Sequence, residues 1–349
     1  MEQNGKVTAA DATVIIITLN RPDYVKRCLD CLVAQTEQAG QIIVVDASPD
    51  PLTLDVCADY QSVLYLRNEN GFGRMTKSRN IGLRSAKGSI IAFLDDDSFA
   101  EPEWLAQLLT GYSDSKVGAV GGRALNNQPN EEMIGVTDLG KIKKDGQLCG
   151  FFAADPGRII EVDHVMGCNM SFRREVLAQL GGFREDYPGI SGLCEDTDMC
   201  LRVKRLGYRI LFVPAARVFH VGAPQAVGRR FDTRWMFFNN RNFSCLLMRN
   251  FGPFSKLLWA HLIFSNIRGI SQCCRKIGSA VLHLSAYTIG GIIGLLSAFA
   301  LIMRSGYTPL RTDAVGEELR QLLASPATPA QTSKSDGLAV TGTSQSSHR

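Results

Sequence analysis

The chain has 349 residues, enough for two domains, and its 45% hydrophobic and 21% charged residues exclude an intrinsically disordered protein. The formal net charge of +4 is small and its basic residues are scattered, which argues against a nucleic-acid-binding surface. The ten cysteines form neither a disulfide framework nor a complete zinc motif, and we expect reduced thiols, with Cys28 and Cys31 packed in the core. The polar residues 1–12 lack the pattern of a secretory signal, which predicts a cytosolic protein.

The first half of the chain alternates apolar runs with helix-like segments. Strands are expected at 13–18, 41–46, 62–66 and 89–94, and helices at 23–36 and 77–86. This alternation predicts an α/β fold with a mainly parallel central sheet flanked by helices. Ligands of such sheets bind beyond the carboxyl ends of the strands, so the polar side chains that follow the strands are the first functional candidates. They are Asn20, Asp46 and Asp95 to Asp97.

The second half is less regular. Residues 126–163 are rich in Gly, Asp, Asn and Lys, and are expected to form loops or a small excursion. A helix is expected from near Arg173. Another helix is expected at 195–206, followed by short strands at 209–213 and 217–219.

An apolar region follows. Between Lys276 and Arg304 no charged side chain occurs, and this stretch is long enough to span a bilayer. Gly290, Gly291 and Gly294 dilute its apolar character, so a buried hairpin or an interfacial helix is an alternative to a full span. We expect this region to contact a membrane.

These patterns divide the chain into four parts. They are a polar extension at 1–12, an α/β domain at 13–250, an apolar helical and membrane-associated segment at 251–304 and a mostly disordered tail at 305–349. From Ser325 onward the tail consists largely of Ser, Thr, Ala, Pro and Gly, and disorder is expected there.

Three consecutive carboxylates, Asp95 to Asp97, directly follow an apolar strand. Like charges this close repel one another unless a cation or several hydrogen-bond donors offset them. Mg²⁺ and Mn²⁺ prefer oxygen ligands and commonly bridge carboxylates to the phosphates of a substrate. The run therefore predicts a divalent-metal site that binds a diphosphate, whereas the alternative is a solvated acidic loop that caps the next helix.

A second acidic group, Glu195, Asp196 and Asp198, lies at the start of a predicted helix. Helix N-termini favour negative charge, so capping alone could explain these residues. A reaction in which a hydroxyl attacks a sugar carbon also needs a carboxylate that accepts the proton, and a helix start holds such a group firmly.

Two further side chains are candidates for the site. His220 follows a strand, and neutral imidazole is a common ligand of transition metals, although a lone histidine is more often structural. Arg79 could face a diphosphate or form a surface ion pair. The glycines at 71 and 73 do not make a dinucleotide-binding loop, because a third glycine is missing and the first strand does not precede them.

Taken together, these segments resemble glycosyltransferase family 2, the inverting enzymes with the GT-A fold. The resemblance runs from about residue 13 to about residue 250. It is carried, in the family's order, by VIIITLNRP, QIIVVDAS, NENGFGRMTKSRNIGLRSAKGSIIAFLDDDS, MGCNMSFRRE, GGF and EDTDMCLRVKRLGYRILFVPAARVFHVG. The chain departs from the family where an acid and a glycine often follow the second strand, and where a proline is usual in the first.

The resemblance implies a role for each candidate residue. It makes Asp46 a contact to the nucleotide base, Asp95 and Asp97 the metal-binding D-x-D pair, His220 a third metal ligand and Asp196 the catalytic base. The remaining candidates are Glu195 as a second catalytic acid, and Asn20, Arg79 and Asp96 as donor-binding residues.

The expected activity is therefore transfer of a sugar from a nucleotide-diphosphate donor to a hydroxyl of a saccharide or lipid-linked acceptor. It is expected to invert the anomeric configuration, to depend on Mg²⁺ or Mn²⁺, and to take place at the cytoplasmic face of a membrane. A sugar-phosphate nucleotidyltransferase would use the same acidic metal site, but the first strand is not followed by a glycine-rich, basic phosphate loop. A non-catalytic membrane scaffold would not need the acids, the base and the histidine.

Overall fold

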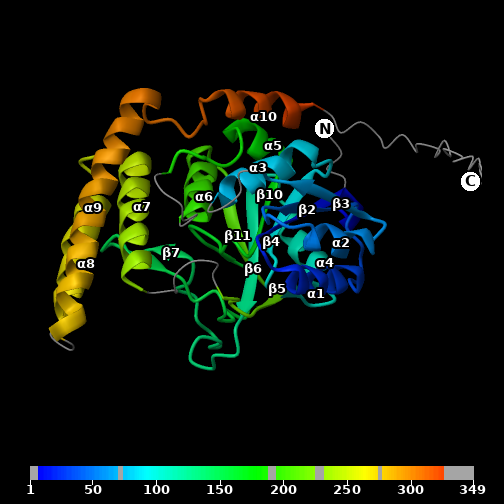
Figure 1. Cartoon of the computed structure of the whole chain (residues 1–349), viewed down its shortest axis with the longest axis horizontal. Coiled ribbons are helices and arrows are strands. Elements are labelled where there is room, and N and C mark those ends of the chain that lie inside the picture. Colours follow the sequence, from blue (N-terminus) through cyan, green and yellow to red (C-terminus); the bar gives the residue numbers. More distant parts are fainter. Residues whose placement is uncertain (1–6, 70–73, 188–193, 225–231, 274–276, 326–349) are drawn as a thin grey trace, which may run out of the picture.

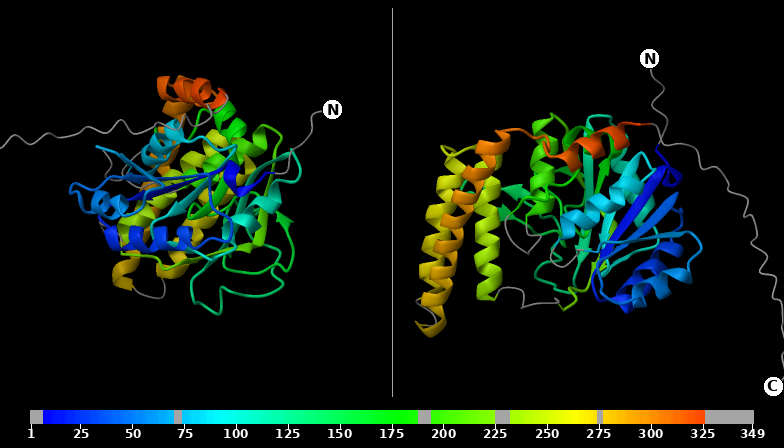
Figure 2. Two further views of the ribbon diagram at one scale, coloured as in Figure 1. Left: turned by 90° about the vertical axis from the view of Figure 1, so that its right-hand side faces the viewer. Right: turned by 45° about the horizontal axis from the view of Figure 1, so that its top comes forward.

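In a computed structural model of the chain, the described residues are 7–69, 74–187, 194–224, 232–273 and 277–325, and side chains are described outside 265–283. They form one large mixed sheet with helices on both faces, and a group of three long helices beside it (Figure 1). A last helix lies across one end of the sheet and its covering helices (Figure 2).

One half of the sheet is parallel, as the sequence predicts. The strands β1 (Ala12–Thr18), β2 (Gln41–Asp46), β3 (Val63–Arg67) and β4 (Ile90–Asp95) lie in the order β3-β2-β1-β4, and each neighbouring pair is parallel. All seven residues of β1 are buried, which explains its continuous run of apolar and β-branched side chains. The helices α1 (Pro22–Val33), α2 (Leu52–Ala58) and α3 (Met75–Ser85) connect these strands.

The other half of the sheet is mixed, which corrects the expectation of a mainly parallel sheet. It consists of β5 (Ser98–Ala100), β6 (Val117–Leu125), β9 (Ile160–Glu161), β10 (Asn169–Arg173) and β11 (Arg209–His220). The strand β10 runs antiparallel between β4 and β6, and β11 is parallel to β6 but antiparallel to β5 and β9. The two strands expected at 209–213 and 217–219 are one strand, whose register against β6 shifts between Val213 and Arg217.

Apolar side chains fill both faces of the sheet. One core packs α1 and α4 (Trp104–Leu109) against the sheet, and the other packs α3, α5 (Arg174–Leu180) and α6 (Glu195–Arg205) against its opposite face. Short 3₁₀ turns at Ala9–Asp11 and Thr110–Tyr112 complete this part of the chain.

The excursion expected at 126–163 is mostly loop, with a small hairpin of β7 (Lys141–Ile142) and β8 (Leu148–Cys149) and the edge strand β9. The hairpin lies against α8 (Lys256–Cys273): a Cβ atom on Gly146 would stand 2.3 Å from the carbonyl oxygen of Leu257. Gln147 Nε2 also lies 3.1 Å from Nδ1 of His261. The excursion therefore joins the sheet to the helices beyond it.

The three long helices, α7 (Thr233–Phe251), α8 and α9 (Ile277–Ser305), form what we call the appendage. The glycines of α9 allow it to approach α7 closely, since a Cβ atom on Gly290 or Gly294 would lie 2.6 Å from the Phe237 carbonyl oxygen or 2.2 Å from that of Arg241. These glycines serve helix packing. Helix α7, expected within the α/β domain, contacts both α6 and α9.

Residues 305–324 correct a second expectation, because they are not disordered. Helix α10 (Ala314–Ala324) packs on α3 and α5, and its Leu319 and Leu323 are buried in the core. Asp313 caps the start of this helix, as its side chain accepts a hydrogen bond from the Gly316 N–H. Residues 326–349, where disorder is also expected, lie outside the described residues.

Candidate active site

The strand order brings the sequence-predicted side chains to one edge of the sheet. In the register of the parallel strands, Asp95 lies beside Ile17 and Asp46 lies beside Thr18, so the ends of β4 and β2 flank the end of β1. His220 is the last residue of β11 and pairs with Ser98 of β5. Ser98 directly follows the acidic run at 95–97. Residues that are far apart in sequence therefore converge at the carboxyl ends of the strands, as expected for this class of sheet.

Asp95, Asp97 and His220 form a cluster that could hold a metal ion. Their ligand atoms all lie within 4.8 Å of one another, and His220 Nε2 is 3.3 Å from Asp97 Oδ1. Within the described part of the chain, the buried Oδ1 atom of Asp95 has no hydrogen-bond partner. Two carboxylates, an imidazole and an oxygen without a donor fit a divalent ion of the Mn²⁺ type.

The two carboxylates of this cluster have different electrostatic surroundings. Burial raises the pKa of Asp95, and Asp97 and Asp196 add to this effect while Arg79 opposes it. Burial also acts to raise the pKa of Asp97, but His220, the Ala223 N–H and Arg21 together lower it below the usual value. Ala223 N donates to Asp97 Oδ2 at 2.7 Å, while His220 lies beside Oδ1, so both oxygens of this carboxylate have a partner.

Asp96 is not among the ligands of this cluster and is 2% exposed. Its two oxygens accept hydrogen bonds from Thr18 Oγ1 at 2.7 Å and from Arg21 Nη1 at 2.9 Å. Arg21 Nη2 in turn donates to the carbonyl oxygen of Pro224 at 2.7 Å. Burial raises the pKa of Asp96 to about 6, against the opposing effect of Arg21. These contacts assign Asp96 a bracing role between β1 and the acidic run, and its donor contact stays a prediction.

Asp46 and Asn20 meet at the ends of the first two strands. Asp46 accepts hydrogen bonds from the Ser48 N–H at 2.8 Å and from the Tyr65 hydroxyl at 2.9 Å. Asn20 adopts a left-handed backbone, with φ of 56°, and its N–H donates to Ser48 Oγ at 2.7 Å. Ser48 therefore links the two candidates, a role that spacing alone does not reveal. Their contacts to a nucleotide stay predictions.

Arg79 is buried and joins the two acidic groups. It is 1% exposed, its Nη1 donates to Glu195 Oε1 at 2.6 Å, and its Nη2 lies 3.5 Å from Asp95 Oδ1. The surface ion pair considered from the sequence is therefore excluded. Burial raises the pKa of Glu195 to about 7, with Arg79 opposing this shift. Arg79 holds the Glu195 carboxylate in place, and its role as a second catalytic acid stays a prediction.

Asp196 is the partly exposed acid of this helix start. Its Oδ2 accepts a hydrogen bond from the Gly167 N–H at 3.0 Å, and its Oδ1 accepts one from the Thr197 N–H at 2.6 Å. A Cβ atom at position 167 would lie 3.0 Å from Arg79 Nη2 and 3.4 Å from Asp196 Oδ2, so the glycine permits this close approach. Two backbone donors orient the carboxylate while one side of it stays accessible, which is the arrangement a general base requires.

The comparisons with known proteins agree with this geometry. The family model "Glycosyl transferase family 2" matches residues 13–181, and a second model, the N-terminal domain of galactosyltransferase, matches residues 150–223. The second match covers the Gly167 loop, the Asp196 helix and His220.

Curated relatives include two sugar transferases. A glucosyl-dolichyl phosphate glucuronosyltransferase of Haloferax volcanii is 26% identical over 60% of this chain and 68% of its own length. The O-antigen chain rhamnosyltransferase WbaN of Salmonella anatum is 28% identical over 57% of this chain and 63% of its own. The matches span from 14% to 68% of the lengths of the first four curated relatives.

Among solved structures, a mannosyltransferase of Pyrobaculum calidifontis, in complex with GDP-Man and Mn²⁺, superposes with a TM-score of 0.50 at 19% identity. The superposition covers 90% of this chain and 84% of the other. At this identity it establishes the fold alone. From the family model, the relatives and the superposition, the chain contains a glycosyltransferase family 2 domain, matched over residues 13–181, and has the GT-A fold.

Proposed function

We propose that the chain transfers a sugar from a nucleotide-diphosphate donor to a hydroxyl group of a saccharide or lipid-linked acceptor, with inversion at the anomeric carbon. The observation that carries this proposal is the placement of Asp95, Asp97 and His220 beside the oriented carboxylate of Asp196. One edge of the sheet thus offers ligands for a donor-bound cation and an acid that could accept a proton.

Each described side chain has a separate task in the proposed reaction. Asp196 takes the proton of the acceptor hydroxyl as that oxygen attacks the anomeric carbon, and the Gly167 N–H holds its carboxylate in place. Arg79 offsets the mutual repulsion of Asp95, Glu195 and Asp196. With one base and no protein nucleophile, a single displacement inverts the configuration.

Asp95, Asp97 and His220 are the residues that would hold Mg²⁺ or Mn²⁺. When bound, the ion would offset the negative charge that develops on the departing diphosphate. The donor set of two carboxylates and an imidazole suits Mn²⁺ well, because imidazole is a good ligand for transition metals.

A screen of nucleotide sugars tests the proposal. Full-length protein is heated with each donor, with and without Mn²⁺, because a ligand that binds only the folded state raises the unfolding temperature. The expected result is one donor class that stabilises the chain in the presence of Mn²⁺ and is turned over when acceptors are supplied. Stabilisation by a nucleoside triphosphate with pyrophosphate release would instead support nucleotidyl transfer.

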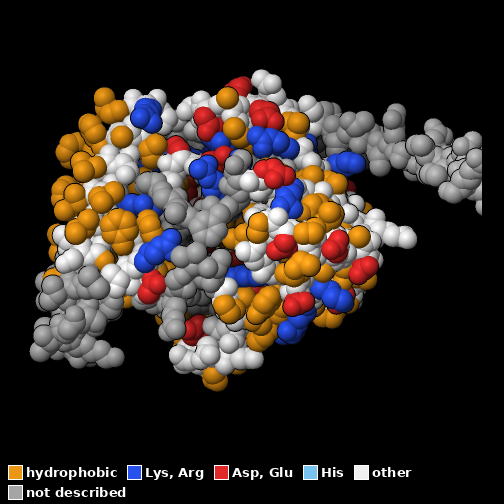
Figure 3. Space-filling view, viewed as in Figure 1, with side chains coloured by type: hydrophobic (Ala, Val, Ile, Leu, Met, Phe, Trp, Pro, Cys, Tyr) orange, Lys and Arg blue, Asp and Glu red, His pale blue; other side chains and the backbone are white. Residues whose placement is uncertain are grey.

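We also propose that the appendage contacts the bilayer that carries a lipid-linked acceptor, on its cytoplasmic side. Within the described residues, α9 contains the one segment long and apolar enough to cross a membrane, Leu284–Ser305, of which 28% is buried. Figure 3 shows hydrophobic side chains gathered along the outer side of the appendage. The large exposed ones on α8 and α9 are Trp259, Ile263, Phe264, Ile289, Ile292, Ile293, Leu296, Phe299 and Met303.

Charge supports an anionic bilayer as the partner. From residue 233 to residue 312 the chain contains nine Lys and Arg residues and no Asp or Glu. Basic residues beside an apolar face favour anionic lipid headgroups. Sedimentation with vesicles of phosphatidylcholine alone, or mixed with phosphatidylglycerol, tests this. Stronger binding to the mixed vesicles that weakens in high salt is expected, whereas binding to neither would remove the proposal.

A further inference from the structure

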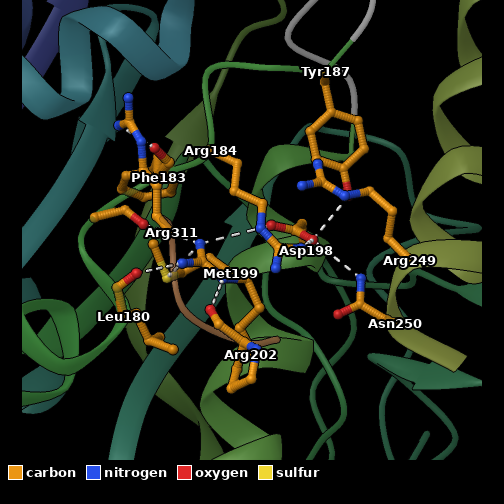
Figure 4. Close-up of polar contacts among 12 residues, drawn as sticks. Leu180, Phe183, Arg184, Tyr187, Asp198, Met199, Arg202, Arg249, Asn250 and Arg311 are labelled. Carbon is orange, nitrogen blue, oxygen red and sulfur yellow. Dashed lines mark hydrogen bonds and ion pairs between the residues drawn. The ribbon is translucent and has the colours of Figure 1, made fainter. Parts of the chain in front are cut away.

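Helix α6, whose first turn carries the proposed base Asp196, is connected to the appendage by a buried polar cluster centred on Asp198 (Figure 4). Asp198 is 1% exposed, and its Oδ1 accepts hydrogen bonds from Arg184 Nη1 at 3.1 Å, from the Tyr187 hydroxyl at 2.8 Å and from Asn250 Nδ2 at 3.0 Å. Its Oδ2 lies 3.7 Å from Arg202 Nη1. None of these partners belongs to the metal cluster or contacts Asp196 through its carboxylate.

The partners of Asp198 come from three separate parts of the chain. Arg184 and Tyr187 belong to the segment after α5, Arg202 to α6 itself and Asn250 to the last turn of α7. Arg184 and Arg202 also donate to carbonyl oxygens of residues 308 and 309, in the connection between α9 and α10. The cluster thus joins α6 to the C-terminal end of α7 and to the connection that follows α9.

The C-terminal end of α7 is held by an ion pair as well as by hydrogen bonds. Arg249, next to Asn250, forms two contacts with Asp186, at 2.8 and 3.1 Å, and its guanidinium lies 5.3 Å from the centre of the Tyr187 ring. Burial acts to raise the pKa of Asp198, but Arg184, Arg202 and Arg249 together lower it. The carboxylate is therefore ionised, and a buried charge of this kind depends on every partner around it.

Asp198 and Asp196 lie on opposite sides of the first turn of α6. Successive helical residues are rotated by about 100°, so positions two apart differ by about 200°. Asp196 points to the Gly167 N–H and Asp198 points to the appendage. Any movement of this turn relative to the appendage would move the Asp196 carboxylate relative to the metal cluster.

We propose that Asp198 is a positioning residue that fixes the Asp196 carboxylate by anchoring the first turn of α6 to the appendage through Asn250, Tyr187 and Arg184. The appendage is then part of the catalytic unit as well as a membrane contact. The proposal rests on the proposed function only where it identifies Asp196 as the base.

The test removes the hydrogen bond that the appendage donates to Asp198, in the full-length chain. Asn250→Ala removes one hydrogen bond to Asp198 without leaving a charge unpaired. Asn240→Ala is the matched control, because Asn240 is also a buried asparagine of α7, but it bonds the Tyr287 carbonyl oxygen at 2.6 Å and His261 at 2.9 Å, inside the appendage. Tyr187→Phe is the gentler variant if Asn250→Ala does not fold.

Hydrogen exchange of peptides that contain Gly167 and Thr197 reports the position of Asp196 directly, since both N–H groups donate to its carboxylate. Asn250→Ala is expected to raise exchange there by about tenfold, the usual scale for losing a hydrogen bond to a charged group. We expect kcat to fall by about tenfold or more at an unchanged donor Kd, because small displacements of a base are costly. Asn240→Ala is expected to change neither quantity.

The proposal is overturned if Asn250→Ala lowers the unfolding temperature as Asn240→Ala does, but leaves exchange at Gly167 and Thr197 and kcat at the wild-type values. That result would make the cluster a purely structural contact. If wild-type protein transfers no sugar while the exchange data change as expected, the proposed function fails and the anchoring of α6 stands.

Discussion

The edge of the sheet and the region of the appendage differ in the sign of the charged residues that they concentrate. At the edge of the sheet, five acidic residues are concentrated at 95–97 and 195–196, whereas residues 233–312, which include the appendage, contain no Asp or Glu and nine Lys and Arg residues. Acids gathered at this edge suit a cation that binds a diphosphate, and the lack of acids in residues 233–312 suits contact with an anionic surface. The Asp198 cluster is the joint between these two regions, since an acid of α6 meets arginines and an asparagine there.

The largest effect is expected for Asp196→Asn. The amide keeps the shape of the side chain but cannot accept a proton, so kcat should fall by about two to four orders of magnitude, the usual contribution of general acid–base catalysis. Donor affinity in the presence of Mn²⁺ should remain at the wild-type value. Steady-state kinetics and calorimetry measure the two quantities, and wild-type turnover in this variant would refute the assignment of the base.

The appendage should be acid-sensitive because of His261. Burial lowers the pKa of His261 to about 4, below its ordinary 6.5, so the unfolded chain binds the proton more readily. The stability that this neutral histidine contributes is complete above about pH 6.5 and is lost as pH falls to about 4. A shift of about 2.5 pKa units corresponds to about 3 kcal/mol.

Denaturant unfolding between pH 7.5 and 4.5 measures this loss. His261→Gln, which retains an amide able to face Gln147 and Asn240, should flatten the pH dependence of the unfolding free energy. An unchanged acid dependence in this variant would mean that other groups control the stability of the appendage.

A smaller effect is expected for Gly294→Ala, which tests the packing within the appendage. The added Cβ atom would lie 2.2 Å from the Arg241 carbonyl oxygen, so α9 must move away from α7. Overpacking of this kind costs about 1–3 kcal/mol. Gly150→Ala provides a control, because a Cβ atom there has nothing within 4 Å. Equal unfolding free energies for the two variants would contradict the close approach of the helices.

Local sequence patterns predicted the parallel half of the sheet well. The strands β1 to β4 are within one residue of the expected ranges at each end, because their apolar runs and the polar residues that end them are local signals. The antiparallel direction of β10 depends on long-range pairing with β4 and β6, which no local pattern records. Helix α10 departs from the expected disorder because this short amphipathic segment directly precedes a tail rich in Ser, Thr and Pro, whose composition dominates the sequence pattern there.

For the site, too, local patterns indicate the candidate residues but not the contacts between distant segments. The run at Asp95 to Asp97, together with the residue that ends β11, located the metal cluster. The sequence could not reveal that Arg79 is buried between Asp95 and Glu195, or that Asp96 is turned toward Thr18 and Arg21, since both depend on the packing of distant segments.

The cation is the centre of this account, and a titration of divalent metal into the full-length chain tests it most directly. Calorimetry with Mn²⁺ and GDP or UDP is compared between wild type and Asp97→Asn, which is close in shape but lacks the charge beside His220. We expect the nucleotide to bind wild type in a Mn²⁺-dependent manner that a chelator abolishes, and to bind the variant at least about tenfold more weakly. Nucleotide affinity that is the same in both proteins, with or without chelator, would contradict the account.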